Sequence, residues 1–212
     1  FLSFYNVHTP IQENKEFIDY YVEKLKSYEN ISPQTVKEGD AITLLNQRNA
    51  KYASMVHATD QNVGRIISFL KENDIYDNTL IIFTSDNGGL STQRRVAPTS
   101  VYPLRAGKGW LYEGGIRIPQ LIKLPKQKIK EIISEPVVSY DLFPTIANIL
   151  NLNHSVSDID GLDLSNLFLK KDIERDFIFW HFPHYHGSMW KPGSALRNND
   201  WKLVELHEEN KI

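Results

Sequence analysis

Apolar residues recur at helical spacing in three stretches of the chain. They predict a helix over 14–27, a long helix over 41–73 and a shorter helix over 139–151. The long stretch carries an apolar stripe through residues such as Val56 and Ile67, with polar residues between them. This arrangement is typical of helices that pack one face against a core.

Shorter apolar runs predict strands between the helices. Residues 1–7 form an aromatic strand candidate, and 79–84 is a β-branched run of the kind that is buried on both faces of a sheet. A third strand is predicted over 116–124, where Pro119 favours an edge or a bend. A helix, a buried strand and then a polar glycine-rich loop are typical of an open, largely parallel sheet. In such sheets, sites form beyond the carboxyl ends of the strands.

The pattern changes after residue 160. Short aromatic segments over 177–182 and 201–206 predict antiparallel strands of a smaller unit. The predicted fold class is therefore α/β, with a mixed sheet flanked by helices and a smaller antiparallel C-terminal subdomain. We place the division between 1–165, part of an α/β core, and 166–212, the incomplete smaller subdomain.

Composition narrows the function classes. Lys and Arg number 24 and Asp and Glu 26, giving a formal net charge of -2, which argues against a nucleic acid or an anionic membrane surface as partner. The chain has no cysteine, which excludes a disulfide, a thiolate zinc site and a cysteine nucleophile within these residues. The longest strongly apolar run, 80–83, is far shorter than the roughly 20 residues of a membrane span. Because the chain starts at Phe1 inside a strand-like segment, we expect a piece of a longer protein.

The first chemical candidate is the pair Asp86-Asn87, directly after the strand predicted over 79–84. Adjacent side chains on such a turn can both point at one ion. One charged and one neutral oxygen suit Ca²⁺ or Mg²⁺ better than zinc. An ordinary Asx turn is the alternative interpretation, because Asp-Asn-Gly-Gly also favours turns.

Lys108 lies between two glycines, which lets a backbone approach an anion closely and leaves the ammonium exposed to it. A flexible basic loop is the alternative. His8 follows the first strand candidate alone, and a lone histidine is more often structural than functional. His181 and His184 lie in the aromatic segment 180–186, which suits a carbohydrate- or anion-binding wall, a metal site or a packed edge strand.

Taken together, these motifs resemble the type I sulfatases of the alkaline-phosphatase superfamily. The resemblance covers nearly the whole chain, and the motifs occur in the order of the family. The C-terminal part resembles the bacterial branch related to arylsulfatase A, many members of which act on sulfated polysaccharides. The motifs are FLSFYNVHTPIQ, TLIIFTSDNGG, PLRAGKGWLYEGGIRIP, SYDLFPTIANIL and WHFPHYHG…SALRNNDWKLVE.

The resemblance implies an alkaline-phosphatase-like fold and hydrolysis of sulfate esters, with a sulfated carbohydrate or an aryl sulfate as substrate. It implies Ca²⁺ as the cofactor, with Mg²⁺ less favoured, a formylglycine nucleophile, and a periplasmic or extracellular location. It also implies roles for six residues of this chain. Asp86 and Asn87 match calcium ligands, Lys108 matches the lysine that contacts the sulfate group and the leaving oxygen, His8 matches a histidine of the sulfate pocket, and His181 and His184 fall where substrate is recognised.

The chain departs from the family pattern at the nucleophile. Formylglycine is made from Cys or Ser in a C/S-x-P-x-R motif, but the segment that starts at Ser134 has Val138 where Arg is needed. We therefore expect the nucleophile in a missing N-terminal half and expect the isolated segment to be inactive. One alternative is a phosphoryl-transfer member of the superfamily, against which Asn87 argues because it favours an oxygen-loving ion. The other is a non-catalytic remnant that binds sulfated glycans.

Overall fold

The computed structural model describes residues 1–28, 32–127, 130–152 and 159–209. The chain divides into two compact units. The predicted division between residues 165 and 166 stays a prediction. The first unit comprises Phe1–Gln127, Trp180–Ala195 and Val204–Ile212, and the second comprises Lys128–Phe179 and Leu196–Leu203.

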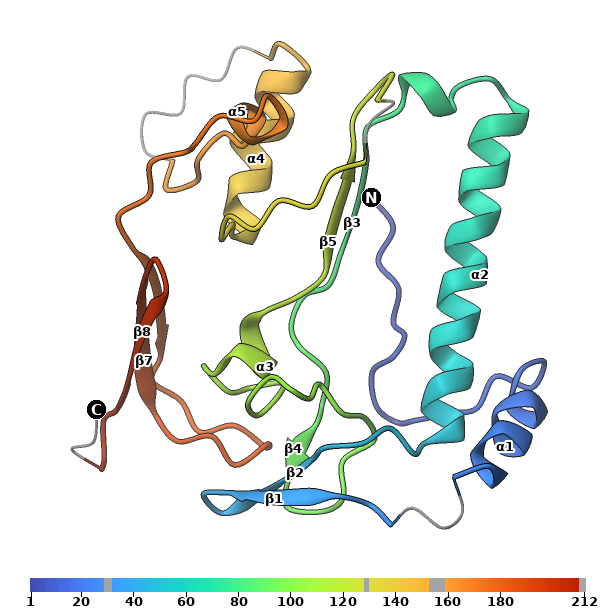
Figure 1. The fold of residues 1–212 in the computed structure, drawn as a ribbon, viewed down its shortest axis with the longest axis vertical. Coiled ribbons are helices and arrows are strands. Elements are labelled where there is room, and N and C mark those ends of the chain that lie inside the picture. Colours follow the sequence, from blue (N-terminus) through green and yellow to red (C-terminus); the bar gives the residue numbers. More distant parts are fainter. Residues whose placement is uncertain (29–31, 128–129, 153–158, 210–212) are drawn as a thin grey trace. The chain divides into compact units, whose positions relative to one another are not determined.

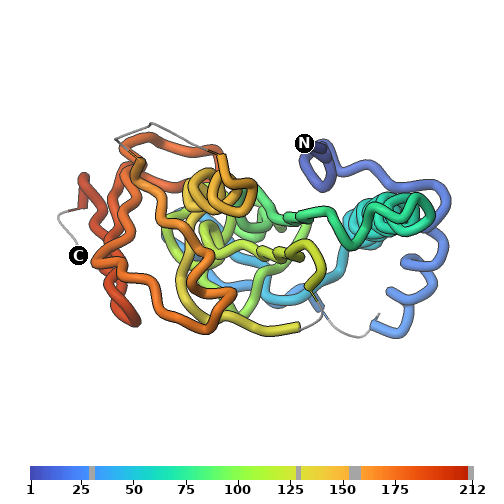
Figure 2. The backbone as a smooth tube through the Cα atoms, turned by 90° about the horizontal axis from the view of Figure 1, so that it is seen from above, coloured from blue at the N-terminus to red at the C-terminus, as the bar shows by residue number. Residues whose placement is uncertain are grey.

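Two helices of the first unit pack side by side (Figures 1 and 2). The first, α1 (Ile18–Lys26), lies within the helix predicted over 14–27. The second, α2 (Ala50–Glu72), begins after Asn49, whose side chain accepts a hydrogen bond from the backbone N–H of Tyr52 at 3.1 Å. This cap satisfies one of the free N–H groups of the first turn and fixes where the helix starts.

The prediction that the long helix starts at residue 41 was wrong. A hairpin of β1 (Thr35–Glu38) and β2 (Ala41–Leu44) precedes it, and Gly39 supplies the positive φ of +57° at the turn. Three side chains of β2 are at most 3 % exposed, so burial in a small sheet decides the conformation there. The sheet is completed by β4 (Thr92–Gln93) in the order β1-β2-β4.

A second sheet pairs β3 (Ile81–Thr84) with β5 (Gln120–Lys123) in antiparallel register. Both strands were predicted, with wider bounds. The prediction that the first of them is buried on both faces was wrong, since Phe83 is 37 % exposed and Leu121 of its neighbour 62 %. The reason is that, in the described part of the chain, β3 pairs with β5 alone.

The strand predicted over 1–7 was also wrong. This segment forms no strand, and Phe1, Leu2 and Tyr5 are exposed. It is held instead by contacts with α2, where the Asn6 amide donates to the backbone oxygen of Met55 at 3.2 Å. Apolar side chains alone do not form a strand when no neighbouring backbone receives its hydrogen bonds.

An aromatic core joins distant parts of the first unit. Trp110 is 7 % exposed and Trp190 1 %, and their rings pack edge to face with centroids 5.5 Å apart. The indole N–H of Trp110 donates to the backbone oxygen of Ser188 at 3.0 Å. This contact fixes the segment around residue 188 on the loop that carries Trp110.

Three consecutive strands form the last sheet, in the order β6-β7-β8. They are β6 (Ile178–Phe182), β7 (Gly193–Asn198) and β8 (Trp201–Leu206), and Asn199 at φ 50° turns the chain between the last two. The strands predicted over 177–182 and 201–206 are confirmed. The middle strand was not predicted.

In the second unit, Asp141 organises the chain. Its carboxylate is fully buried, accepts hydrogen bonds from the backbone N–H groups of Val138 at 2.8 Å and Leu162 at 2.9 Å, and pairs with Arg175 at 2.6 Å. The helix predicted over 139–151 is confirmed as a 3-10 turn, η2 (Ser139–Asp141), followed by α4 (Leu142–Ile149).

The remaining elements are short: η1 (Tyr76–Asn78), α3 (Glu113–Ile116) and α5 (Ser165–Phe168).

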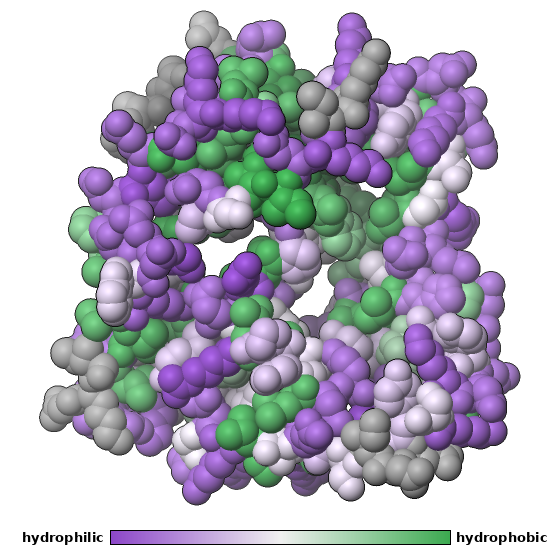
Figure 3. All heavy atoms as spheres, in the orientation of Figure 1, coloured by the Kyte–Doolittle hydropathy of each residue, from purple (hydrophilic) through white to green (hydrophobic). Residues whose placement is uncertain are grey.

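Apolar residues reach the surface among polar ones on the face shown in Figure 3. Across the described ranges, no helix combines the length and apolar character that a membrane crossing needs.

Candidate active site

The candidate site is built from two loops of the first unit. One follows β3 and carries Asp86 and Asn87, and the other carries Lys108. The backbone N–H of Gly88 donates to the oxygen of Gly115 at 2.9 Å, and the N–H of Lys108 donates to the oxygen of Gly89, also at 2.9 Å. The two loops are therefore held together by their backbones.

Glycine makes this close approach possible. A side-chain carbon at Gly88 would overlap the backbone oxygen of Gly114, and one at Gly107 would overlap Ser91 and the oxygen of Gly89. Ser91 is fully buried, and its hydroxyl donates to the backbone oxygen of Ala106 at 2.6 Å. The glycines that the sequence places around Lys108 thus have a packing role.

Asp86 is exposed and Asn87 half-buried at the start of this arrangement. An Asx turn would require the Asp86 carboxylate to accept a backbone N–H, and among the described residues it accepts none. A carboxylate and an amide oxygen are ligands that Ca²⁺ accepts, but the ion takes six to eight oxygens. No group of three or more His, Asp or Glu side chains lies close enough to hold an ion within the described ranges. The pair fits part of a cation site.

Lys108 is half-buried, and its charge acts on His186. Burial, and then the charge of Lys108, hold the pKa of His186 below its ordinary value. His186 was not among the predicted site residues, since nothing in the segment 180–186 separates it from the other two histidines there. Gly109, with φ +81°, lies against the His186 ring, and this glycine was the available signal.

The structure does not bring His8 to these loops. His8 is exposed in the N-terminal segment, where its Nδ1 donates to the backbone oxygen of Thr9 at 2.7 Å and its ring lies 5.3 Å from that of Tyr5. Within the described residues it forms no hydrogen bond or ring contact with the Lys108 loop. Its assignment to the sulfate pocket stays a prediction.

His181 and His184 are also exposed. His181 Nδ1 lies 2.9 Å from the hydroxyl oxygen of Ser194, which in turn lies 3.0 Å from Nε2 of His207. The ring of His184 packs edge-on to Phe182 at 6.0 Å. These contacts place both histidines on the surface of the β6-β7-β8 region, and their role in substrate binding stays a prediction.

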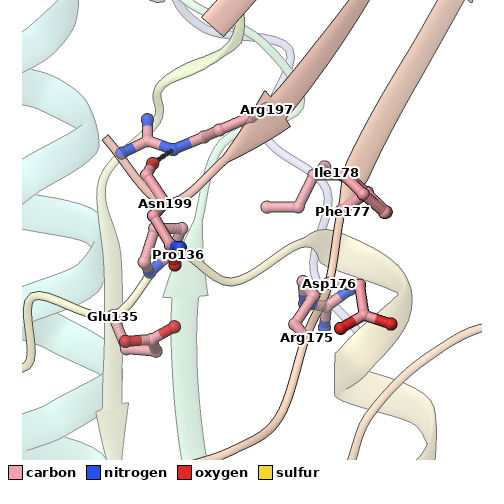
Figure 4. A pocket seen from close by; sticks show the side chains of 8 residues that line it. All are labelled: Glu135, Pro136, Arg175, Asp176, Phe177, Ile178, Arg197 and Asn199. Carbon is pink, nitrogen blue, oxygen red and sulfur yellow. Dashed lines mark hydrogen bonds between the residues drawn. The ribbon is translucent and has the colours of Figure 1, made fainter. Parts of the chain in front are cut away.

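The second unit has a small pocket (Figure 4). Its lining combines carboxylates, guanidinium groups and apolar side chains, and Arg197 Nε donates to the backbone oxygen of Asn199 at 2.9 Å. None of the predicted site residues lies there. The lining residues are Glu135, Pro136, Arg175, Asp176, Phe177, Ile178, Arg197 and Asn199.

Comparison with known proteins gives one consistent result. The Sulfatase family model matches residues 1–152, and the model for the C-terminal region of N-sulphoglucosamine sulphohydrolase matches residues 106–212. A sulfatase of Formosa agariphila is 33% identical over 181 residues, which cover 76% of this chain and 32% of the relative. The chain thus spans about a third of the length of this curated relative.

Two solved structures share the fold of this chain. The crystal structure of Ps i-CgsB in complex with k-i-k-neocarrahexaose is similar at a TM-score of 0.69 and 31% identity, covering 96% of this chain and 40% of that chain. The phosphonate monoester hydrolase of Agrobacterium radiobacter is similar at a TM-score of 0.52 and 26% identity, covering 74% of this chain and 32% of that chain. The likeness confirms the predicted α/β fold with its smaller antiparallel C-terminal part.

Proposed function

This chain belongs to the sulfatase family, and we propose that the protein of which it forms part hydrolyses sulfate esters. The observation that carries the proposal is the junction of the two loops, which is formed by the backbone hydrogen bonds from Gly88 to Gly115 and from Lys108 to Gly89. This junction sets a pair of oxygen ligands and a primary ammonium on neighbouring, glycine-packed loops. A cation held by the oxygen ligands and the nearby ammonium would together suit an anionic ester.

In this proposal Asp86 and Asn87 would hold Ca²⁺, with Mg²⁺ less favoured. The bound cation would supply positive charge against the sulfate oxygens. The two residues provide only part of the six to eight oxygens that Ca²⁺ takes, so the remaining ligands are expected outside residues 1–212.

Lys108 would contact the sulfate group and the bridging oxygen. A sulfate ester carries one negative charge, and further charge develops on the bridging oxygen as the S–O bond breaks. A fixed ammonium stabilises that developing charge without reorganising during the reaction. The hydrogen bond from the backbone N–H of Lys108 to the backbone oxygen of Gly89 holds the Lys108 backbone in place.

The substrate class is proposed as a sulfated carbohydrate, with aryl sulfates as simpler substrates. Support comes from the similarity to Ps i-CgsB, whose structure holds k-i-k-neocarrahexaose, a carbohydrate. A periplasmic or extracellular location belongs to the same proposal and rests on the family alone. Cell fractionation with antibody against the chain would test the location.

The nucleophile is expected in an N-terminal half that acts together with this chain. The C/S-x-P-x-R motif from which formylglycine is made does not occur in residues 1–212. The exposed apolar side chains of β3 and β5, Phe83 and Leu121, are available for contact with that half. Residues 1–212 alone are therefore expected to show no turnover.

Phosphoryl transfer is the second candidate function, because the similar Agrobacterium radiobacter protein is a phosphonate monoester hydrolase. Asn87 beside Asp86 favours an oxygen-loving ion and so the sulfatase activity. Comparing kcat/KM for 4-nitrophenyl sulfate with that for a 4-nitrophenyl phosphonate monoester separates the two. A remnant that only binds sulfated glycans would turn over neither.

The deciding experiment uses the full-length protein with Ca²⁺. Asp86→Ala and Lys108→Ala are each expected to lower kcat about 10²–10³-fold on an aryl sulfate, the cost of removing one preorganised charge-stabilising group. Asp86→Ala is also expected to weaken Ca²⁺ binding measured by calorimetry. Asp77→Ala, an exposed carboxylate before β3, is the matched control. Wild-type activity and Ca²⁺ affinity in Asp86→Ala would refute the cation site.

A further inference from the structure

The turn over residues 183–190 is docked on the Lys108 loop. Ser188 is 2 % exposed, and its backbone oxygen accepts the indole N–H of Trp110, two residues after Lys108. Trp190, at the end of the turn, packs edge to face on the same indole. The turn therefore has a fixed place beside Lys108 within the first unit.

The imidazole of His186 lies directly on the loop backbone. Any side chain at Gly109 would collide with this ring, and Gly109 has a φ of +81° that favours glycine. His186 thus covers the residue that follows Lys108. In the described part of the chain, neither His181 nor His184 is among the nearest neighbours of Gly107 or Gly109.

The hydrogen bonds of His186 fix its protonation. The backbone N–H of Ser188 donates to His186 Nδ1 at 3.2 Å, and the Ser188 hydroxyl lies 2.8 Å from the same nitrogen. A backbone N–H can only donate, so Nδ1 must accept and carries no proton. The single proton of the neutral ring is then on Nε2. Burial and the charge of Lys108 lower the pKa of His186, which favours the same neutral form.

We propose that His186 contacts the substrate, with its Nε2–H donating a hydrogen bond to a substrate oxygen next to the group that Lys108 binds. This rests on the proposed sulfate-ester hydrolysis. A neutral hydrogen-bond donor beside an ammonium orients the substrate without adding a second positive charge. This combination suits a monoanionic ester attached to a polar carbohydrate. The oxygen belongs either to the sulfate group or to a hydroxyl of the sugar.

The test compares two variants of the full-length protein on two substrates. His186→Phe keeps an aromatic ring but has no donor, and we expect kcat/KM for a sulfated oligosaccharide to fall about tenfold, as for the loss of one hydrogen bond. His186→Gln keeps an N–H donor and is expected to recover most of the loss. An equal loss on an aryl sulfate assigns the bond to the sulfate group, and a loss confined to the oligosaccharide assigns it to the sugar.

Tyr185→Phe is the matched control. Tyr185 is the adjacent residue of the same turn, exposed, and its hydroxyl bonds to Glu208. We expect unchanged kcat/KM. An unchanged kcat/KM in His186→Phe on both substrates would overturn the role of His186. Absence of turnover by the wild-type protein on every sulfate ester would instead contradict the proposed function.

A spectroscopic readout is independent of activity. In ¹⁵N-labelled protein at pH 7, the imidazole of His186 is expected to give the NMR signature of the neutral Nε2–H tautomer. A purely structural ring would not also produce the substrate-dependent loss described above. An imidazolium, or a tautomer with the proton on Nδ1, would overturn the proposal.

Discussion

The two loops of the candidate site and the Asp141 region of the second unit hold their chains together by different means. In the site loops, backbone groups bond directly to backbone groups across glycines, as between Gly88 and Gly115. Around Asp141, one buried carboxylate joins two backbone N–H groups to Arg175. We therefore expect an added side-chain atom to destabilise the site loops. We expect the loss of the carboxylate to destabilise the region around Asp141.

This difference has a consequence for function. The two loops are joined through their backbones, and within the described ranges the side chains of Asp86 and Lys108 form no hydrogen bond or ion pair that holds the fold together. This is what the proposed binding of an ion and a substrate requires. The Asp141 side chain is fully occupied by the fold. Asp141 is therefore a structural residue, although aspartate is also a residue type that often takes part in catalysis.

The largest expected effect is at Asp141. Asp141→Ala leaves the Arg175 guanidinium, which is 9% exposed, without its partner and frees two backbone N–H groups. Breaking a buried ion pair in this way costs about 3–5 kcal/mol of the free energy of unfolding. Urea unfolding of the full-length protein measures it, with Asp172→Ala, an exposed carboxylate of the same unit, as control. A change below 1 kcal/mol would remove Asp141 as the organising residue.

The next effect tests the glycine packing. Gly88→Ala forces a carbon into the backbone oxygen of Gly114, and overpacking of this kind costs about 1–3 kcal/mol. We also expect lower activity, because the Asp86-Asn87 turn must shift. Gly64→Ala is the matched control: Gly64 lies in α2 with open space around it, and alanine there should stabilise the protein by up to about 1 kcal/mol. Equal stability in both variants would contradict the comparison.

The smallest expected effect is the pH dependence from His186. Its pKa is lowered in the folded protein, so the unfolded chain takes up a proton first as the pH falls. Stability is therefore fully present above the ordinary histidine pKa of about 6.5 and is lost as the pH falls below it. His186→Gln should show a smaller decrease in Tm between pH 7 and 5. An equal or larger decrease in the variant would show that His186 is not the group responsible.

The sequence pattern predicted correctly those helices and strands whose conformation depends mainly on residues nearby in the sequence. The helices around α2 and α4 and the strands β3, β5, β6 and β8 follow from apolar periodicity. The hairpin of β1 and β2 was missed because its burial comes from the distant strand β4, which helical spacing cannot reveal. The strand expected over 1–7 failed for the opposite reason, since it has apolar side chains without a partner strand.

The sequence by itself determined which residues of the two loops are candidates for the chemistry. Asp86, Asn87 and Lys108 stand out because their types and their glycine neighbours are local properties of the chain. Only the tertiary structure decided which histidine lies on the Lys108 loop. His181, His184 and His186 have similar sequence surroundings, and the choice depends on Trp110 and Gly109, more than 70 residues away, which hold the His186 ring against the Lys108 loop.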